Sequence, residues 1–279
     1  MTDAIPDEVL LPRYTNAESR FVNLGEQRIH YRDEGKRDGR TILLLHGSQA
    51  SLHTWEPWVE LLSMDFRLVT ADLPGHGFSS PIADGNYSLE PMTRLIGDLA
   101  RKLALPQFTL VGSGLGALLS ISFAARHQQD LAGLVLVACA GYDCDDPQLF
   151  SRTSSQSEAR KELEQCYHNP SFVTDQLFNR YYELSLRAGN SDAQSSLQKH
   201  TAQYNLPRAL RDDLKNLKLH SLIMWGQNDR WLPTSVAEQF HQDLPLSTLR
   251  IYPRAGHLPM EEQAEMTAAG LKSFMLGTL

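Results

Sequence analysis

Two polar side chains near the end of the chain have the types and the order that acid–base catalysis needs. Asp229 follows the strand-like run LIMW, and His257 follows the run STLRIY. A histidine can take a proton from a nucleophile and return it to a leaving group, while a carboxylate fixes the imidazole tautomer and stabilises its cation. We therefore expect Asp229 and His257 to meet as an acid–base pair beyond the ends of two strands.

A glycine-rich turn stands earlier in the chain, where FTLV is followed by GSGLGA and a helix-forming run. The central residue of this turn is Gly114, which carries neither a hydroxyl nor a carboxylate. The same turn also fits a dinucleotide-binding fingerprint through Gly112, Gly114 and Ala117. That fingerprint belongs in the first strand–helix turn with an acid at the end of the next strand, and Asp130 instead precedes the next strand, so we disfavour it.

The elements that must position these residues alternate between strand and helix patterns. Strand-like runs are RFVNL and QRIHYRD, then TILLL, FRLVTA, FTLV, LAGLVLVA, HSLIMW and STLRIY, and residues 89–103 have helical spacing of apolar side chains. Such alternation predicts a mostly parallel sheet flanked by helices, with the first two runs as an antiparallel hairpin. Residues 141–218 contain helical patterns without a convincing strand, which indicates a helical insertion over the sheet.

Four landmarks in this order carry a family resemblance: LLLHGS at 43–48, DLPGHGFSS at 72–80, VGSGLGA at 111–117, and the pair Asp229 and His257. Together they resemble the α/β-hydrolase superfamily, of the serine-hydrolase type with a helical cap. The resemblance implies an α/β-hydrolase core at 1–140 and 219–279 and a cap at 141–218. It gives DLPGHGFSS no catalytic role.

The resemblance also implies a catalytic site. In the family's G-x-S-x-G nucleophile elbow the serine precedes a helix, and here its position is held by Gly114. Asp229 and His257 are then the acid and base of the triad, and the backbone N–H groups of Ser48 and Leu115 form the oxyanion hole. The implied activity is hydrolysis of an ester, thioester, lactone or C–C bond in a small, partly apolar substrate, without a cofactor or a metal.

Gly114 leaves three explanations open. The chain is an inactivated variant of a serine hydrolase and is impaired as written. Alternatively the glycine is natural, and Asp229 with His257 activates water or performs proton-transfer chemistry such as a lyase step. The third explanation is a receptor-like binding protein of the same fold, which keeps the pocket without turnover.

Composition limits the partners and the location. A net charge of −7 with no run of basic residues argues against nucleic acid, and a small molecule is the expected partner. The apolar stretch 108–125 is better explained by a strand and a helix than by a membrane span, and the first residues lack a signal-peptide pattern, so we expect a cytoplasmic protein. Cys139, Cys144 and Cys166 have no disulfide or zinc spacing, and the oligomeric state stays open.

Aromatic residues give weaker predictions. Tyr181 and Tyr182 fall in the insertion, and without an aspartate nucleophile nearby we interpret them as cap packing rather than as ring-opening acids. The four tryptophans lie near the loops of the expected site, and pocket lining and core packing are equal alternatives for Trp55, Trp58, Trp225 and Trp231.

Overall fold

The structure, a computed structural model, describes residues 4–142, 155–201 and 208–278. Its centre is an eight-stranded sheet with the strand order β1-β2-β4-β3-β5-β6-β7-β8. The strands are β1 (Ser19–Leu24), β2 (Gln27–Gly35), β3 (Thr41–Leu45), β4 (Arg67–Ala71), β5 (Phe108–Ser113), β6 (Leu131–Val137), β7 (Ser221–Gly226) and β8 (Ser247–Tyr252). β2 pairs antiparallel with β1 and with β4, and all other pairs are parallel, so the predicted mostly parallel sheet is confirmed.

The local sequence explains why these strands form and where they turn. Every residue of β3, TILLL, is buried, as expected for a central parallel strand covered on both faces. In the predicted hairpin Leu24 pairs with Gln27, and Gly25 between them has a φ of 62°. Glycine adopts this left-handed conformation without a steric cost, so the two-residue turn closes easily.

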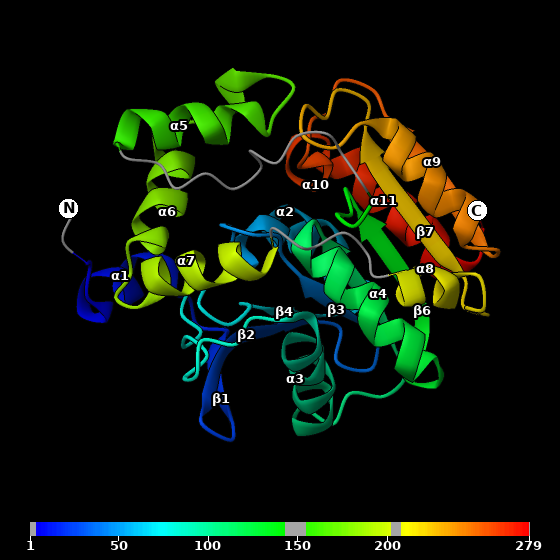
Figure 1. Ribbon diagram of the computed structural model, residues 1–279, viewed down its shortest axis with the longest axis horizontal. Helices are drawn as coiled ribbons and strands as arrows, with labels where there is room; N and C mark the ends of the chain where they lie inside the picture. The colour runs from blue at the N-terminus through cyan, green and yellow to red at the C-terminus, as the bar shows by residue number, and fades with distance from the viewer. Residues whose placement is uncertain (1–3, 143–154, 202–207, 279) are drawn as a thin grey trace.

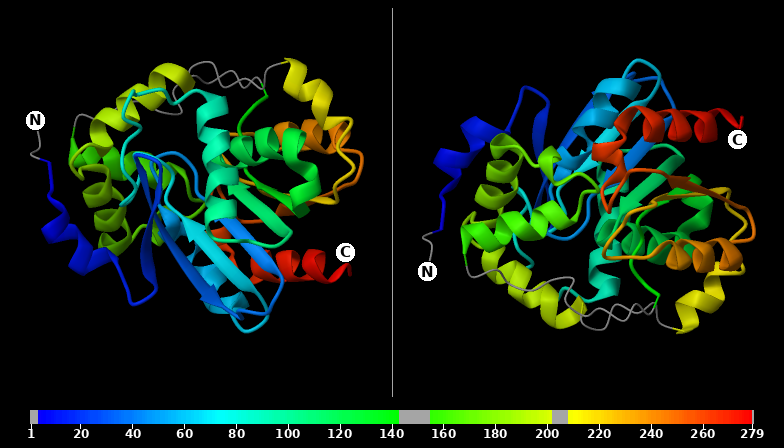
Figure 2. Two further views of the ribbon diagram at one scale, coloured as in Figure 1. Left: turned by 90° about the horizontal axis from the view of Figure 1, so that it is seen from below. Right: turned by 90° about the horizontal axis from the view of Figure 1, so that it is seen from above.

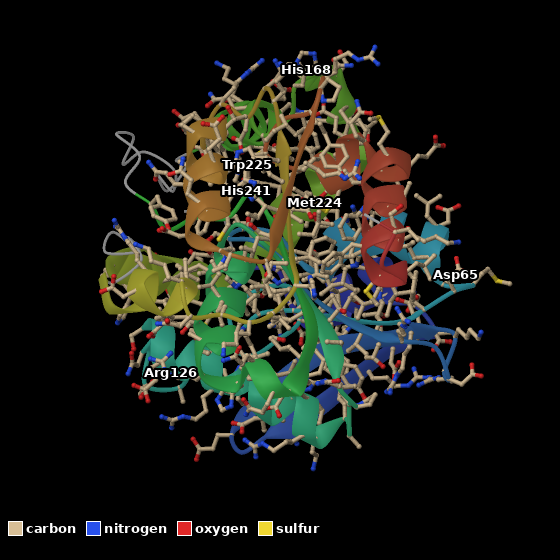
Figure 3. The ribbon with its side chains drawn as sticks, turned by 90° about the vertical axis from the view of Figure 1, so that its right-hand side faces the viewer. Asp65, Arg126, His168, Met224, Trp225 and His241 are labelled. Carbon is tan, nitrogen blue, oxygen red and sulfur yellow. The ribbon has the colours of Figure 1, made fainter. Side chains whose placement is uncertain are left out.

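Helices cover both faces of the sheet (Figure 1). One face is covered by α3 (Leu89–Lys102), α4 (Leu115–His127), α8 (Arg208–Leu214) and α9 (Thr234–Asp243), and the other by α2 (Glu56–Leu62) and α11 (Ala264–Leu276). Adjacent residues of β7 point to opposite faces, because Trp225 belongs to the first apolar cluster and Met224 to the second. Figure 3 shows both residues between α9 and α11.

Between β6 and β7 the described residues contain no sheet strand, only helices. They are α5 (Gln156–Gln165), a 3-10 turn (Pro170–Phe172), α6 (Asp175–Ser185), α7 (Asn190–Thr201) and α8. In Figure 1 the helices α5, α6 and α7 lie together on one side of the sheet. The last helix, α8, instead packs against α4, with Leu210 and Leu214 buried in the core beside it. The range predicted as a cap thus includes one helix that packs on the core.

A helix at the N-terminus, α1 (Asp7–Tyr14), was not anticipated from the sequence, and it has Pro12 inside it. It lies beside α6, as both views of Figure 2 show. Asp7 accepts hydrogen bonds from the Arg187 guanidinium at 2.6 and 3.0 Å, and Arg13 pairs with Glu183 at 2.9 Å. These ion pairs attach the N-terminal segment to the helices that follow β6.

Candidate active site

A cavity of about 120 Å³ lies where the loops at the carboxyl ends of β3 and β5 meet α5 and α6. Residues 47–50, residues 113–115 and His257 line it from the sheet side, and apolar side chains such as Leu163 and Phe178 line it from the helical side. Ligands of open α/β sheets bind beyond the carboxyl ends of the strands, so the cavity has the position expected for a ligand.

Gly114 forms the turn between β5 and α4 and borders this cavity. Its backbone angles are φ 51° and ψ −112°, a combination that costs other residues strain energy. The neighbouring glycines allow the turn to be tight. A Cβ atom on Gly112 would lie 2.3 Å from the backbone of Gly116, and one on Gly116 would lie 2.3 Å from the carbonyl oxygen of Leu45.

Asp229 and His257 meet as the sequence predicts. The His257 Nδ1 and the Asp229 Oδ2 are 2.8 Å apart, and the Asp229 side chain is completely buried. The second carboxylate oxygen of Asp229 accepts hydrogen bonds from the backbone N–H groups of Trp231 and Leu232 at 2.9 and 3.0 Å. Because all these contacts hold the carboxylate in place, the imidazole is oriented with its Nε2 away from Asp229.

The Nε2 edge of that imidazole is turned toward Gly114. A Cβ atom built on Gly114 lies 3.7 Å from the His257 Nε2 and 3.7 Å from the Gly47 Cα, with no closer atom outside its chain neighbours. A serine side chain therefore fits at position 114 without a clash. Its hydroxyl would have the imidazole nitrogen within hydrogen-bonding range, as a nucleophile and its base require.

Hydrogen-bond donors lie at the same end of the cavity. Leu115 is the first residue of α4, so its backbone N–H has no partner within the helix, and Ser48 follows Gly47 in the loop after β3. The hydroxyl oxygens of Ser48 and Ser113 are buried and have no hydrogen-bond partner within the described part of the chain. The structure thus brings Gly114, Asp229, His257, Ser48 and Leu115 together at one site.

The loop that carries His257 is attached to the segment between α5 and α6. The His257 N–H donates to the Cys166 carbonyl at 2.6 Å. Glu262 accepts hydrogen bonds from the backbone N–H groups of Gly256, His168 and Asn169 at 2.8, 2.9 and 2.7 Å. Figure 3 shows His168 at the top edge of the molecule. One carboxylate therefore joins the histidine loop to the helices above it, and we call this arrangement the Glu262 clamp.

Comparison with known proteins decides the family. The model of the alpha/beta hydrolase fold family matches residues 40–264, which is most of the chain. The chain belongs to this family. The predicted family and fold class are therefore confirmed.

Two curated relatives are each 27% identical to this α/β-hydrolase over the aligned residues. One is the 2-hydroxy-6-oxo-2,4-heptadienoate hydrolase of Pseudomonas putida, aligned over 89% of this chain and 93% of the relative. The other is the 2-hydroxy-6-oxononadienedioate/2-hydroxy-6-oxononatrienedioate hydrolase of Escherichia coli, aligned over 91% of this chain and 94% of the relative. Among solved structures, the meta-cleavage product hydrolase CumD of Pseudomonas fluorescens, in a variant complexed with acetates, has a TM-score of 0.86 and 24% identity. That alignment covers 95% of this chain and 100% of CumD, and it supports the fold.

The two tyrosines predicted as cap packing in this α/β-hydrolase both line the cavity. Tyr182 stacks on Phe178, with ring centroids 5.4 Å apart, whereas Tyr181 donates to the buried Glu261 at 2.6 Å. Burial and the Glu261 carboxylate raise the pKa of Tyr181 well above its usual range, so the phenol keeps its proton. Tyr167 donates to the same carboxylate at 2.8 Å, and the Thr54 hydroxyl is a third donor.

The tryptophans divide between the two predicted alternatives. Trp55, Trp58 and Trp225 are completely buried in the core, whereas Trp231 lines the cavity, and its ring lies 5.1 Å from that of His257. The cavity is also lined by residues that were not predicted to line it: Leu163, Cys166, Phe178 and Leu258. Apolar residues at these places have no signal of their own in the sequence, because cap helices and core helices show the same apolar spacing.

Buried hydrogen bonds attach the DLPGHGFSS loop to the neighbouring strands. The buried Asp72 accepts hydrogen bonds from the backbone N–H groups of Leu52 and Phe78 at 2.7 and 2.9 Å, and its Oδ2 lies 2.7 Å from the His30 Nδ1. Another contact joins the loop to the residue after β3, because the N–H of Leu73 donates to the His46 Nε2 at 2.9 Å. These bonds hold the loop in place.

Three further features concern the cysteines, metal-binding groups and membrane-spanning helices. Cys139 and Cys166 are buried free thiols, and burial raises the pKa of both, while Cys144 lies outside the described residues. Within the described ranges, no group of three or more His, Cys, Asp or Glu side chains is placed to hold a metal ion. In the same ranges, no helix has the length and apolar character needed to cross a membrane.

Proposed function

We propose that the cavity is the active site of a hydrolase for a small, partly apolar substrate with a scissile ester, thioester, lactone or C–C bond. The observation that carries this proposal is the 3.7 Å separation between the Cβ position of Gly114 and the His257 Nε2. At this separation the base, which its carboxylate orients, faces the tight strand-to-helix turn. Nucleophilic acyl transfer requires this arrangement.

In the serine form of this site, His257 would take the proton of the serine hydroxyl as its oxygen attacks the carbonyl carbon of the substrate. The Ser48 and Leu115 N–H groups would donate to the resulting oxyanion, and each such donor commonly contributes about 3 kcal/mol. Asp229 would stabilise the imidazolium, which then protonates the leaving group. In the chain as it stands, Gly114 supplies no nucleophile, and loss of the nucleophile from a serine triad costs about a millionfold in turnover.

The relatives favour a C–C bond as the first substrate to test. Two of them are named as hydrolases of 2-hydroxy-6-oxo acids, and they align with nearly the whole chain. The apolar side chains of α5 and α6 would contact the apolar part of such a substrate. Esters remain the simplest comparison, because they need only the acyl-transfer half of the same site.

The test is turnover of short to medium acyl p-nitrophenyl esters and of 2-hydroxy-6-oxo-2,4-heptadienoate by this chain and by Gly114→Ser. We expect activity to appear in Gly114→Ser at least about a thousandfold above the starting chain, since serine restores the missing nucleophile. His257→Ala in the Gly114→Ser background should abolish it. A folded Gly114→Ser protein that turns over neither kind of substrate would contradict the proposal.

Gly114 also favours a second candidate, a binding protein that keeps the cavity without turnover. The cavity is formed and its His257–Asp229 pair is intact, although no side chain at position 114 can attack a substrate. This candidate predicts saturable binding of a small ligand, measured by calorimetry, with no product in either background. A lyase or proton-transfer enzyme that uses the same pair would instead form product without the serine, and His257→Ala would stop it.

A further inference from the structure

The absence of a side chain at Gly114 leaves space beside the candidate base. Only the Gly47 Cα and the His257 Nε2 lie within 4 Å of the Cβ position, apart from the chain neighbours of Gly114, and both are 3.7 Å away. The space opens into the cavity, because these three residues all line it. Within the described part of the chain, the His257 Nε2 makes no hydrogen bond, since the bond to Asp229 uses Nδ1.

Ser48 and Leu115 line the cavity on the sheet side of this space, and their backbone N–H groups are hydrogen-bond donors there. On the cap side the lining is largely apolar. The His257 Nε2 and these N–H groups are therefore polar groups that an occupant of the space would meet. Buried polar groups are normally paired, so they favour a small polar occupant.

We propose that the space beside Gly114 is an acceptor subsite, which holds a small neutral nucleophile against the His257 Nε2. Water, hydroxylamine and short primary amines have the chemistry it would take. The inference rests on the proposed function, because it uses the same base and the same oxyanion donors. It goes further by assigning to this chain an acyl transfer that passes directly from substrate to a free acceptor.

The step balances without a covalent enzyme intermediate. The lone pair of the acceptor attacks the carbonyl carbon of an ester, and the His257 Nε2 takes the proton that the acceptor loses. The oxyanion, held by the Ser48 and Leu115 N–H groups, then collapses, and the bond to the leaving oxygen breaks. The imidazolium returns its proton to that oxygen, so the products are the acylated acceptor and an alcohol.

Direct transfer differs kinetically from catalysis by a serine. In a single displacement the leaving group departs only when the acceptor is bound, so its release depends on acceptor concentration and saturates with it. In a serine enzyme the leaving group departs during acylation of the serine, before the acceptor reacts, which gives ping-pong kinetics. The two cases are distinguished by the dependence of the initial burst and release rates on the acceptor.

The experiment uses p-nitrophenyl butyrate with increasing hydroxylamine, and measures p-nitrophenol and butyrohydroxamate together. In the starting chain we expect both products to rise in parallel, to saturate with hydroxylamine, and to disappear in His257→Ala. Gly114→Ala places a methyl group in the subsite and should lower the hydroxylamine-dependent rate at least about tenfold. Gly97→Ala, the same change in a helix outside the cavity, should leave it unchanged.

A second variant that places a side chain in the subsite, Gly114→Ser, makes the test independent of the folding of Gly114→Ala. In Gly114→Ser the burst of p-nitrophenol should no longer depend on hydroxylamine, because the serine side chain occupies the subsite. The inference is overturned if the starting chain shows no saturable, His257-dependent transfer, or if Gly114→Ala transfers as fast as the starting chain. Turnover by Gly114→Ser without any transfer in the starting chain would overturn the inference alone. Failure of both would overturn the proposed function as well.

Discussion

At the residue scale, three glycines in one turn have different reasons to be glycine. Gly112 and Gly116 are required by close approach, since a Cβ atom on either would lie 2.3 Å from backbone atoms. Gly114 has space for a side chain, and its requirement is conformational, because its φ is 51°. Positions 112 and 116 therefore have no room for a side chain, whereas a side chain at position 114 fits the space but costs backbone strain.

This difference predicts the effect of Gly116→Ala. The new methyl group would collide with the carbonyl oxygen of Leu45, which belongs to a central strand and cannot move freely, so we expect a loss of about 3 kcal/mol in the free energy of unfolding. Urea denaturation measures it. The matched change Gly97→Ala lies in α3, where the nearest atom is a side-chain carbon of Phe123 at 3.3 Å, and should alter stability by less than about 1 kcal/mol. Equal effects of the two substitutions would contradict this account of the turn.

At the element scale, the histidine loop depends on the helices inserted between β6 and β7. The Glu262 clamp joins Gly256, next to His257, to His168 and Asn169. A Cβ atom on Gly256 would lie 2.4 Å from the Cys166 carbonyl oxygen, so the two segments are in direct backbone contact. The side chain of His257 is thus positioned by Asp229, and its backbone is positioned by the segment between α5 and α6.

Glu262→Gln tests this coupling. The amide keeps the size of the carboxylate but has one acceptor oxygen for three N–H donors, and bonds to a charged acceptor contribute about 1.5–3 kcal/mol each. We expect a loss of about 2–4 kcal/mol in stability and, in the Gly114→Ser background, a fall in kcat that exceeds the change in KM. Glu265→Gln, on the exposed side of α11, is the control for removing one charge. An unchanged kcat with lower stability would show that the clamp is structural without positioning His257.

At the scale of the whole molecule, buried histidines predict how stability depends on pH. Burial lowers the pKa of His53 to about 4, and burial together with the neighbouring His46 lowers that of His76 to about 3. Burial also lowers the pKa of His46. In the unfolded chain these rings titrate near pH 6.5, so below that pH the unfolded state binds more protons than the folded state. Their contribution to stability is fully present above pH 6.5 and is lost as the pH falls toward the folded-state values.

We therefore expect unfolding free energy to fall by about 2 kcal/mol or more between pH 7 and pH 5, with each histidine contributing up to about 1.4 kcal/mol per pH unit. Urea denaturation across this range measures the slope. His76→Asn should reduce it, and its amide can replace the hydrogen bond to the Pro74 carbonyl. The exposed His220→Asn should not change it. A slope that is identical in all three proteins would contradict the assignment.

The amino-acid sequence by itself determined the strands, the glycine turn and the order of the motifs. Runs such as TILLL are short, and their length favours a buried strand over a helix, while the turn requires glycine for reasons of backbone geometry. The family followed from that order, and the model match over residues 40–264 confirms it. The pairing of Asp229 with His257 was also predictable, because both residues follow neighbouring strands of a parallel sheet.

Only the tertiary structure decided how these parts meet. The bond between His168 and Glu262 joins residues 94 positions apart, and no periodicity in either segment records such a contact. The helix α1, which contains Pro12, is stabilised by its contacts with α6 rather than by its own propensity. Likewise, Trp231 and Trp225 have the same side chain, and their different places in cavity and core depend on packing between elements that are distant in the sequence.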